Sequence, residues 1–120
     1  MLWLSDNHPY LVLLALRKSL QSLGLEDLDF YLIHWPMSAK PGLFKASYHD
    51  ENDLVPFDLK GVWTSLEQCH KLGLAKSIGV SNFSINKLEH VLSFATIPPA
   101  VNQMQVLAVS VSYLICLVKE

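Results

Sequence analysis

The fold is decided by the stretch Leu28-Asp29-Phe30-Tyr31-Leu32-Ile33-His34-Trp35. This run is almost wholly apolar and aromatic, and it lacks the alternation of apolar and polar residues that marks a strand with one wet face. A strand that is apolar on both sides is typical of a parallel sheet covered by helices. Pro36 follows the run and ends it, because proline cannot donate a hydrogen bond to a neighbouring strand. The stretch therefore predicts one buried strand of an α/β fold.

A helical pattern comes directly before this strand. Apolar residues recur at helical spacing from Leu11 to Leu23. Asp6 or Asn7 is predicted to cap the start of this helix, because short polar side chains accept hydrogen bonds from the first backbone amides of a helix. Gly24 is predicted to end the helix, since glycine adopts the left-handed conformation that a helix terminus requires.

The same alternation of helix and strand continues after the central run. Asp58 is predicted to cap a second helix that ends at Gly73, and the apolar run 75–80 forms the next strand. Ser84 opens a third helix, and the run 100–104 forms a third strand. Strands that alternate with helices indicate βαβ units and a parallel sheet.

The stretch from Met37 to Pro56 shows neither a helical nor a strand period. A loop of about 20 residues is unusual inside a compact domain and is more often functional than a simple connection. We therefore expect 37–56 to be a functional loop.

Composition excludes several classes of function. The chain has 120 residues, 51% of them hydrophobic and 17% charged, with a formal net charge of −2. These values fit a globular chain, and they give no basic surface for nucleic acid. The apolar run from Val106 to Val118 is shorter than the roughly 20 residues that span a membrane. Cys69 and Cys116 lack a C-x-x-C spacing and are expected to be reduced thiols in the cytoplasm. No metal site is expected.

Polar side chains stand at the carboxyl end of each predicted strand. They are His34, the pair Ser81-Asn82 and the pair Asn102-Gln103. In α/β barrels the ligands bind at these ends, so three neighbouring ends can face one small ligand. Each residue also has a structural interpretation. His34 could be a hydrogen-bonded structural residue, Ser81-Asn82 a helix cap, and Asn102-Gln103 partners of loose backbone groups.

These segments resemble the aldo-keto reductase family. The segment 76–83, Lys-Ser-Ile-Gly-Val-Ser-Asn-Phe, is similar to the second signature of that family. The segment 29–36 resembles its fourth strand, and 101–103 resembles the start of its sixth. The segment 93–99, Ser-Phe-Ala-Thr-Ile-Pro-Pro, is similar to the same segment in plant members of the chalcone- and codeinone-reductase kind. The resemblance implies a partial (β/α)₈ TIM barrel, with parallel strands alternating with helices.

The resemblance also implies a role for each strand-end residue. His34 would orient a substrate carbonyl, and Ser81, Asn82 and Gln103 would hold the nicotinamide carboxamide of NADP(H). The implied function is an NADPH-dependent oxidoreductase that reduces the carbonyls of small aldehydes and ketones. The loop 37–56 would be the first of the family's variable substrate loops.

Two tryptophans and a missing lysine complete the comparison with the family. Trp3 and Trp35 would line an apolar substrate pocket. In the family a tyrosine donates the proton, and the pKa of this tyrosine is tuned by a lysine in a Lys-Leu-Trp segment and by an aspartate. Met1 stands where that lysine would be. As replacements for the catalytic tyrosine, Tyr31 is better explained as a core residue and Tyr48 as part of a solvated loop. We therefore expect the chain to lack the catalytic Asp, Tyr and Lys and to be inactive as this fragment.

A second hypothesis is a non-catalytic pseudoenzyme remnant, or a partner of an intact homologue that associates through exposed sheet edges. The sequence divides into a partial oxidoreductase domain over 1–105 and a divergent apolar tail over 106–120, which does not match the family.

Overall fold

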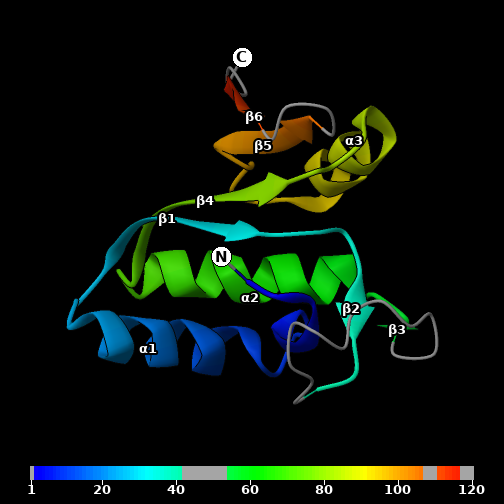
Figure 1. Cartoon of the computed structure of the whole chain (residues 1–120). Coiled ribbons are helices and arrows are strands. Elements are labelled where there is room, and N and C mark those ends of the chain that lie inside the picture. Colours follow the sequence, from blue (N-terminus) through cyan, green and yellow to red (C-terminus); the bar gives the residue numbers. More distant parts are fainter. Residues whose placement is uncertain (1, 42–53, 107–110, 117–120) are drawn as a thin grey trace.

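The computed structural model describes residues 2–41, 54–106 and 111–116, of which 104–106 and 111–116 are described as backbone. The elements follow one another along the chain in the order shown in Figure 1. They are the 3₁₀ helix η1 (Leu4–Asp6), α1 (Val12–Leu23), β1 (Leu28–Ile33), β2 (Ser38–Ala39), β3 (Leu54–Val55), α2 (Leu59–Lys71), β4 (Ala75–Ser81), α3 (Ile85–Phe94), β5 (Val101–Val106) and β6 (Val111–Cys116).

Four strands form the main sheet, in the order β1-β4-β5-β6. β4 runs parallel to both β1 and β5, with Tyr31 opposite Ile78 and Ser81 opposite Gln103. These pairings confirm the predicted βαβ units. β6 differs, because it pairs antiparallel with β5. The sequence predicted no strand in the tail that contains β6, and the predicted parallel strands alternating with helices are found in β1, β4 and β5.

Helices α1 and α2 pack together on one side of β1 and β4, and α3 lies further along, near β5 (Figure 1). The core fills the space between these two helices and the sheet. Its fully buried side chains come from α1, α2 and the helix-facing side of the strands, and include Val12, Leu16, Val62, Trp63, Leu66, Tyr31, Ile33, Ile78 and Val80.

Local capping explains most of the helix ends. The Asp58 carboxylate accepts from the Gly61 amide at 3.0 Å, and the Ser84 hydroxyl accepts from the Lys87 amide at 3.3 Å. Gly24 has a φ of 68° and ends α1 in the left-handed conformation. These three predictions are confirmed.

The predicted cap of α1 is wrong. α1 begins at Val12, and its N-cap residue, Leu11, makes no side-chain capping bond. Asp6 is the last residue of η1, and Asn7 is buried against the segment that follows β1. The Asn7 side chain therefore bonds to residues far away in the sequence, and it does not cap the helix as local spacing predicted.

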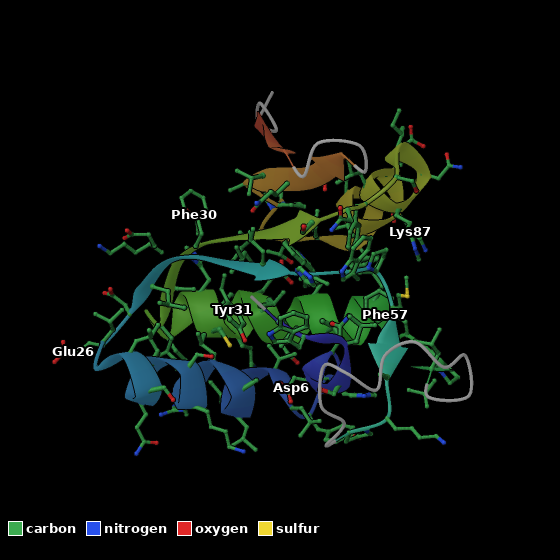
Figure 2. All side chains as sticks on the ribbon, in the orientation of Figure 1. Asp6, Glu26, Phe30, Tyr31, Phe57 and Lys87 are labelled. Atoms are coloured by element: carbon green, nitrogen blue, oxygen red, sulfur yellow. The ribbon has the colours of Figure 1, made fainter. Side chains whose placement is uncertain are left out.

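The strand predicted over residues 28–35 ends at Ile33, and its burial is uneven. Its second half, Tyr31 to Ile33, is buried, whereas Phe30 is 51% exposed. Figure 2 shows Tyr31 directed toward the helices and Phe30 directed to the other side of the sheet. The prediction of burial on both faces is therefore confirmed for the second half of β1 and wrong for Phe30.

The predicted loop 37–56 contains regular pairing at both of its ends. Ser38 and Ala39 in β2 pair antiparallel with Val55 and Leu54 in β3. Residues 42–53, including Tyr48, lie outside the described residues. The two short strands close the base of this loop, which the aperiodic sequence did not indicate.

The apolar run that follows β5 contributes β6 to the sheet. The division of the chain between residues 105 and 106 stays a prediction. Among the described residues, no helix is both long enough and apolar enough to cross a membrane.

Candidate functional site

Hydrogen bonds at Gln103 join the carboxyl end of β4 to the middle of β5, because β5 continues to Val106, beyond the strand that the sequence predicted. The Ser81 hydroxyl donates to the Gln103 carbonyl oxygen at 2.8 Å, and the Asn82 backbone amide donates to the same oxygen at 2.8 Å. Ser81 is 3% exposed, while Asn82 and Gln103 are partly exposed. The two polar pairs therefore lie side by side where β4 ends.

Asn82 also joins β4 to the end of β1. Its backbone has a φ of 59°, in the left-handed region that asparagine adopts more readily than most residues. Its side-chain Nδ2 donates to the His34 carbonyl oxygen and to the Ser81 hydroxyl, both at 3.1 Å. The structure thus brings together residues from the three strands that the sequence singled out, although Gln103 lies inside β5 and not at its end.

Two indole rings flank His34. The ring centroids of Trp3 and His34 are 4.7 Å apart with an interplanar angle of 51°, and those of His34 and Trp35 are 5.7 Å apart at 88°. All three residues are partly buried. Trp3 precedes η1 and Trp35 follows β1, so two separate segments supply the aromatic surroundings of one imidazole.

Asn102 differs from its neighbour Gln103, because both ends of its side-chain amide hydrogen-bond to the backbone. Its Oδ1 accepts from the Phe83 amide at 3.2 Å, and its Nδ2 donates to the Phe83 carbonyl at 3.0 Å. The residue is 1% exposed. The structural interpretation is therefore confirmed for Asn102. Strand alternation could have separated the two residues, because adjacent side chains point to opposite faces.

The helix-cap interpretation of Ser81 and Asn82 is wrong, because Ser84 caps α3. Sequence reasoning also missed Asn7, whose amide contacts the backbone of Trp35 and Met37. The only available signal was a polar residue close to a predicted helix, and that signal suggested a cap.

Tyr31 has the environment of a core residue. It is 1% exposed, and its pKa is raised by burial first, then by the negative charge of Asp6, and then by Cys69 once that thiol has ionised. A phenol whose proton is held this firmly is a poor donor at neutral pH. Tyr10 is 71% exposed. Met1 lies outside the described residues, so the expectation about the absent lysine stays a prediction.

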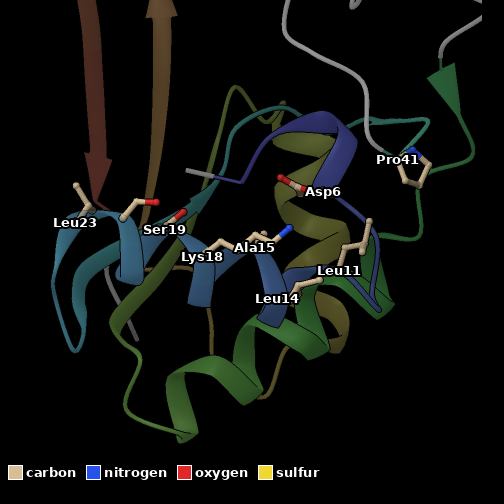
Figure 3. Close-up of a pocket in the computed structure, with 9 residues that line it drawn as sticks. Asp6, Leu11, Leu14, Ala15, Lys18, Ser19, Leu23 and Pro41 are labelled. Atoms are coloured by element: carbon tan, nitrogen blue, oxygen red, sulfur yellow. The ribbon is translucent and has the colours of Figure 1, made fainter.

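A separate concavity of about 570 Å³ lies along the outer face of α1 (Figure 3). It is lined by Asp6, Leu11, Leu14, Ala15, Lys18, Ser19, Ser22, Leu23 and Pro41, and none of the predicted site residues contributes to it. No cluster of three potential metal ligands occurs among the residues whose side chains are described.

The strand-end groups suit a nicotinamide carboxamide. The amide side chains of Asn82 and Gln103 each carry donor and acceptor groups, as a carboxamide does. The Asn82 Nδ2 and the Ser81 hydroxyl already donate within the fold, which fixes the orientation of both side chains. These groups come from the end of β4 and the neighbouring part of β5, which hydrogen bonds hold together. The residues present therefore fit the group that the resemblance implied.

Known proteins resemble this chain closely. It is 62% identical over 104 residues to an NAD(P)H-dependent 6'-deoxychalcone synthase of Glycine max, and 60% identical over 105 residues to deoxymugineic acid synthase 1-D of Triticum aestivum. These matches cover 87% and 88% of this chain, and 33% of each relative. The chain thus spans about a third of the length of these relatives.

Solved structures of aldo-keto reductases share the fold. One is an aldo-keto reductase of Bombyx mori in complex with NADP, which is 36% identical with a TM-score of 0.76 over 88% of this chain and 31% of its own. Another is the aldose reductase of Schistosoma japonicum, which is 34% identical with a TM-score of 0.79 over 88% and 36%. The fold is therefore part of a (β/α)₈ barrel, as predicted. The model of the aldo/keto reductase family matches residues 2–115, and the chain belongs to that family.

Proposed function

We propose that this chain carries the cofactor-orienting part of an NADPH-dependent reductase that acts on the carbonyls of small aldehydes and ketones. The observation that carries the proposal is the Asn82 side chain, which connects the ends of β1 and β4 through His34 and Ser81. Similarity to the NAD(P)H-dependent relative from Glycine max and to the NADP-bound structure from Bombyx mori supports the choice of cofactor.

The proposed roles follow from the chemistry of each side chain. Asn82, Gln103 and Ser81 hold the carboxamide and so fix which face of the nicotinamide ring is presented. His34 donates a hydrogen bond to the substrate carbonyl and orients it, while Trp3 and Trp35 exclude water from the apolar side of the site. Bound NADPH supplies the hydride.

We expect the 120-residue chain on its own to bind NADPH without reducing an aldehyde. The tyrosines whose side chains are described offer no proton donor at the site. Tyr31 is buried on the helix-facing side of β1, and Tyr10 is 71% exposed. Titrating NADPH against the chain, and following NADPH oxidation with benzaldehyde, tests both halves of this expectation. Turnover above the protein-free rate would overturn the second half.

The Asn82→Gly variant tests the assigned site. Glycine keeps the left-handed backbone at this position, so the substitution removes the amide side chain without adding strain. Losing one well-placed hydrogen-bonding group should weaken NADPH binding about tenfold. The matched control is Asn86→Gly on the exposed side of α3, which should leave the NADPH affinity unchanged. Equal affinities of the wild-type chain and Asn82→Gly would contradict the assignment.

A second proposal is association with another polypeptide through the outer edge of β1. Among the described residues, this edge pairs through a bridge between Leu2 and Ile33, and Phe30 is 51% exposed nearby on the sheet face away from α1 and α2. In a mixture with an intact homologue, Phe30→Ser should therefore shift the sedimentation profile away from the complex and toward the free chains. Tyr10→Ser, at another exposed aromatic residue, is the control. Indistinguishable profiles of wild type and Phe30→Ser would rule this edge out.

We also propose a cytoplasmic location. The buried Cys69 is a free thiol, as expected for a reducing compartment. Fractionation of cells that produce the chain tests this, and recovery in the secreted fraction would contradict it.

A further inference from the structure

We propose that Asn7 is a positioning residue, which fixes the places of Trp3 and Trp35, the two indoles beside the proposed carbonyl-binding residue His34. The inference rests on the proposed function, in which these two indoles flank the carbonyl held by His34. No role for Asn7 follows from the cofactor-orienting residues, because its side chain bonds to the segment after β1 and to none of Ser81, Asn82 and Gln103.

The Asn7 amide binds two carbonyls of the segment that follows β1. Its Nδ2 donates to the Trp35 carbonyl oxygen at 3.2 Å and to the Met37 carbonyl oxygen at 2.8 Å. The residue is 1% exposed, and its Oδ1 is buried with no hydrogen-bond partner among the described residues. The side chain therefore acts through its two donor hydrogens, both of which hold the backbone beside Trp35.

Three neighbouring residues extend this connection into what we name the Asn7 clamp, consisting of Asn7, His8, Ser38 and Ala39. The Ser38 hydroxyl donates to the Asn7 carbonyl oxygen at 2.6 Å. The His8 Nε2 lies 2.7 Å from the Ala39 carbonyl oxygen and must carry the proton, because a carbonyl can only accept. All four side chains are buried, and the bonds join residues 28 to 31 positions apart.

The clamp sets where the two indoles stand relative to each other. Trp3 is on the chain just before η1, and Asn7 is just after it, so the position of Trp3 follows that of the η1 segment. Trp35 belongs to the segment that Asn7 holds. Since both rings contact the His34 ring, a shift between the two segments would change the space around the imidazole. The bonds among His34, Ser81, Asn82 and Gln103 do not pass through the clamp.

The first readout is spectroscopic and needs no cofactor. The indole N–H signals of Trp3, Trp35 and Trp63 can be separated by nuclear magnetic resonance and assigned by single Trp→Phe replacements. Trp63 donates to the Ile97 carbonyl at 3.0 Å in the core, so it serves as an internal reference. Asn7→Ala should shift the signals of Trp3 and Trp35 and leave that of Trp63 in place. Asn86→Ala, on the exposed side of α3, should shift none of them.

The second readout separates the carbonyl side of the site from the cofactor side. Benzaldehyde is titrated into the chain saturated with NADP⁺, a complex that cannot react, and NADPH is titrated separately. Asn7→Ala should raise the benzaldehyde dissociation constant about fivefold, because a less firmly held Trp35 must be ordered when benzaldehyde binds. The NADPH dissociation constant should stay within about twofold, because the clamp does not contact the cofactor-orienting residues.

Ser38→Ala is the milder variant, because it removes the hydroxyl bond to Asn7 and keeps the amide. It decides the question if Asn7→Ala does not fold, and it should give the same pattern with smaller shifts. A folded variant with unchanged Trp3 and Trp35 signals would overturn the proposal, and so would equal losses of benzaldehyde and NADPH affinity. If the wild-type chain binds no NADPH, the proposed function fails, while the indole signals still decide whether the clamp positions the two rings.

Discussion

Asn102 holds the turn after β4 with both ends of its side-chain amide. Replacing it with leucine would leave the amide and the carbonyl of Phe83 without their partners in a buried place. Because an unpaired buried polar group costs about 1–3 kcal/mol, Asn102→Leu should lower the free energy of unfolding by about 2–4 kcal/mol. Urea unfolding followed by circular dichroism measures this. Asn86→Leu, on the exposed side of α3, should change the value by less than about 0.5 kcal/mol, and an equal loss in both variants would refute the assignment.

Asn7 shows where residue-level reasoning from sequence reaches its limit. Local spacing identified the caps at Asp58 and Ser84 correctly, because each side chain bonds an amide three residues ahead. The same reasoning failed at Asn7, whose partners are 28 and 30 residues away. A short polar side chain before a helix has the same local signature in both cases. Only the packing of the segment after β1 against η1 distinguishes them.

At the scale of elements, close contact between strands depends on Gly79 at the centre of β4. A Cβ placed there would lie 2.8 Å from Leu32 Cδ2 in β1 and 2.8 Å from the Val101 carbonyl oxygen in β5. Gly79→Ala must therefore push back the backbone of β5 at Val101 and displace the Leu32 side chain, and we expect it to destabilise the chain by about 1–3 kcal/mol. Thermal unfolding of the variant tests this.

The control for Gly79 is another glycine with free space around it. Gly73 has a φ of 79°, and no atom lies within 4 Å of the Cβ that would be added there. Gly73→Ala should therefore cost only the backbone strain of about 1 kcal/mol. A smaller loss in Gly79→Ala than in Gly73→Ala would show that the strands adjust to the methyl group, against our expectation.

The elements differ in how far the sequence could define them. The sequence predicted the bounds of four elements nearly to the residue, namely α2, α3, β4 and the start of β5. In these elements the spacing of the apolar residues and the capping residues indicate the same bounds. The exposure of Phe30 could not be read from its strand, because an apolar run does not reveal whether anything covers its second face. The strands β2, β3 and β6 were missed, since the first two have two residues each and the third lies in a run that was interpreted as a tail.

The same contrast applies to the candidate site. His34, Ser81, Asn82 and Gln103 could be grouped from sequence, because parallel strands end at the same edge of a sheet. The left-handed backbone of Asn82 and the use of Asn102 inside the fold depend on contacts between strands. Those contacts are set by register, which a single sequence specifies only weakly when strands are buried on both faces.

At the scale of the whole molecule, stability should fall in alkaline solution because the core holds two weak acids in their neutral form. Burial raises the pKa of Tyr31 and of Cys69 above their ordinary values of 10.0 and 9.0. The unfolded chain releases these protons at the ordinary values, while the folded chain keeps them. The stabilisation is therefore complete below about pH 9 and is lost progressively as the pH rises through 9 and 10 toward the folded-state values.

Each proton that only the unfolded chain releases should lower the free energy of unfolding by about 1.4 kcal/mol per pH unit. Urea unfolding at a series of pH values between about 7 and 11 measures this slope. Tyr31→Phe and Cys69→Ala each remove one of the two acids, and the double variant should flatten the alkaline decline. Both substitutions lower the stability at neutral pH by a constant amount, so the slope is the quantity to compare. A double variant that declines as steeply as the wild type would show that other groups cause the alkaline loss.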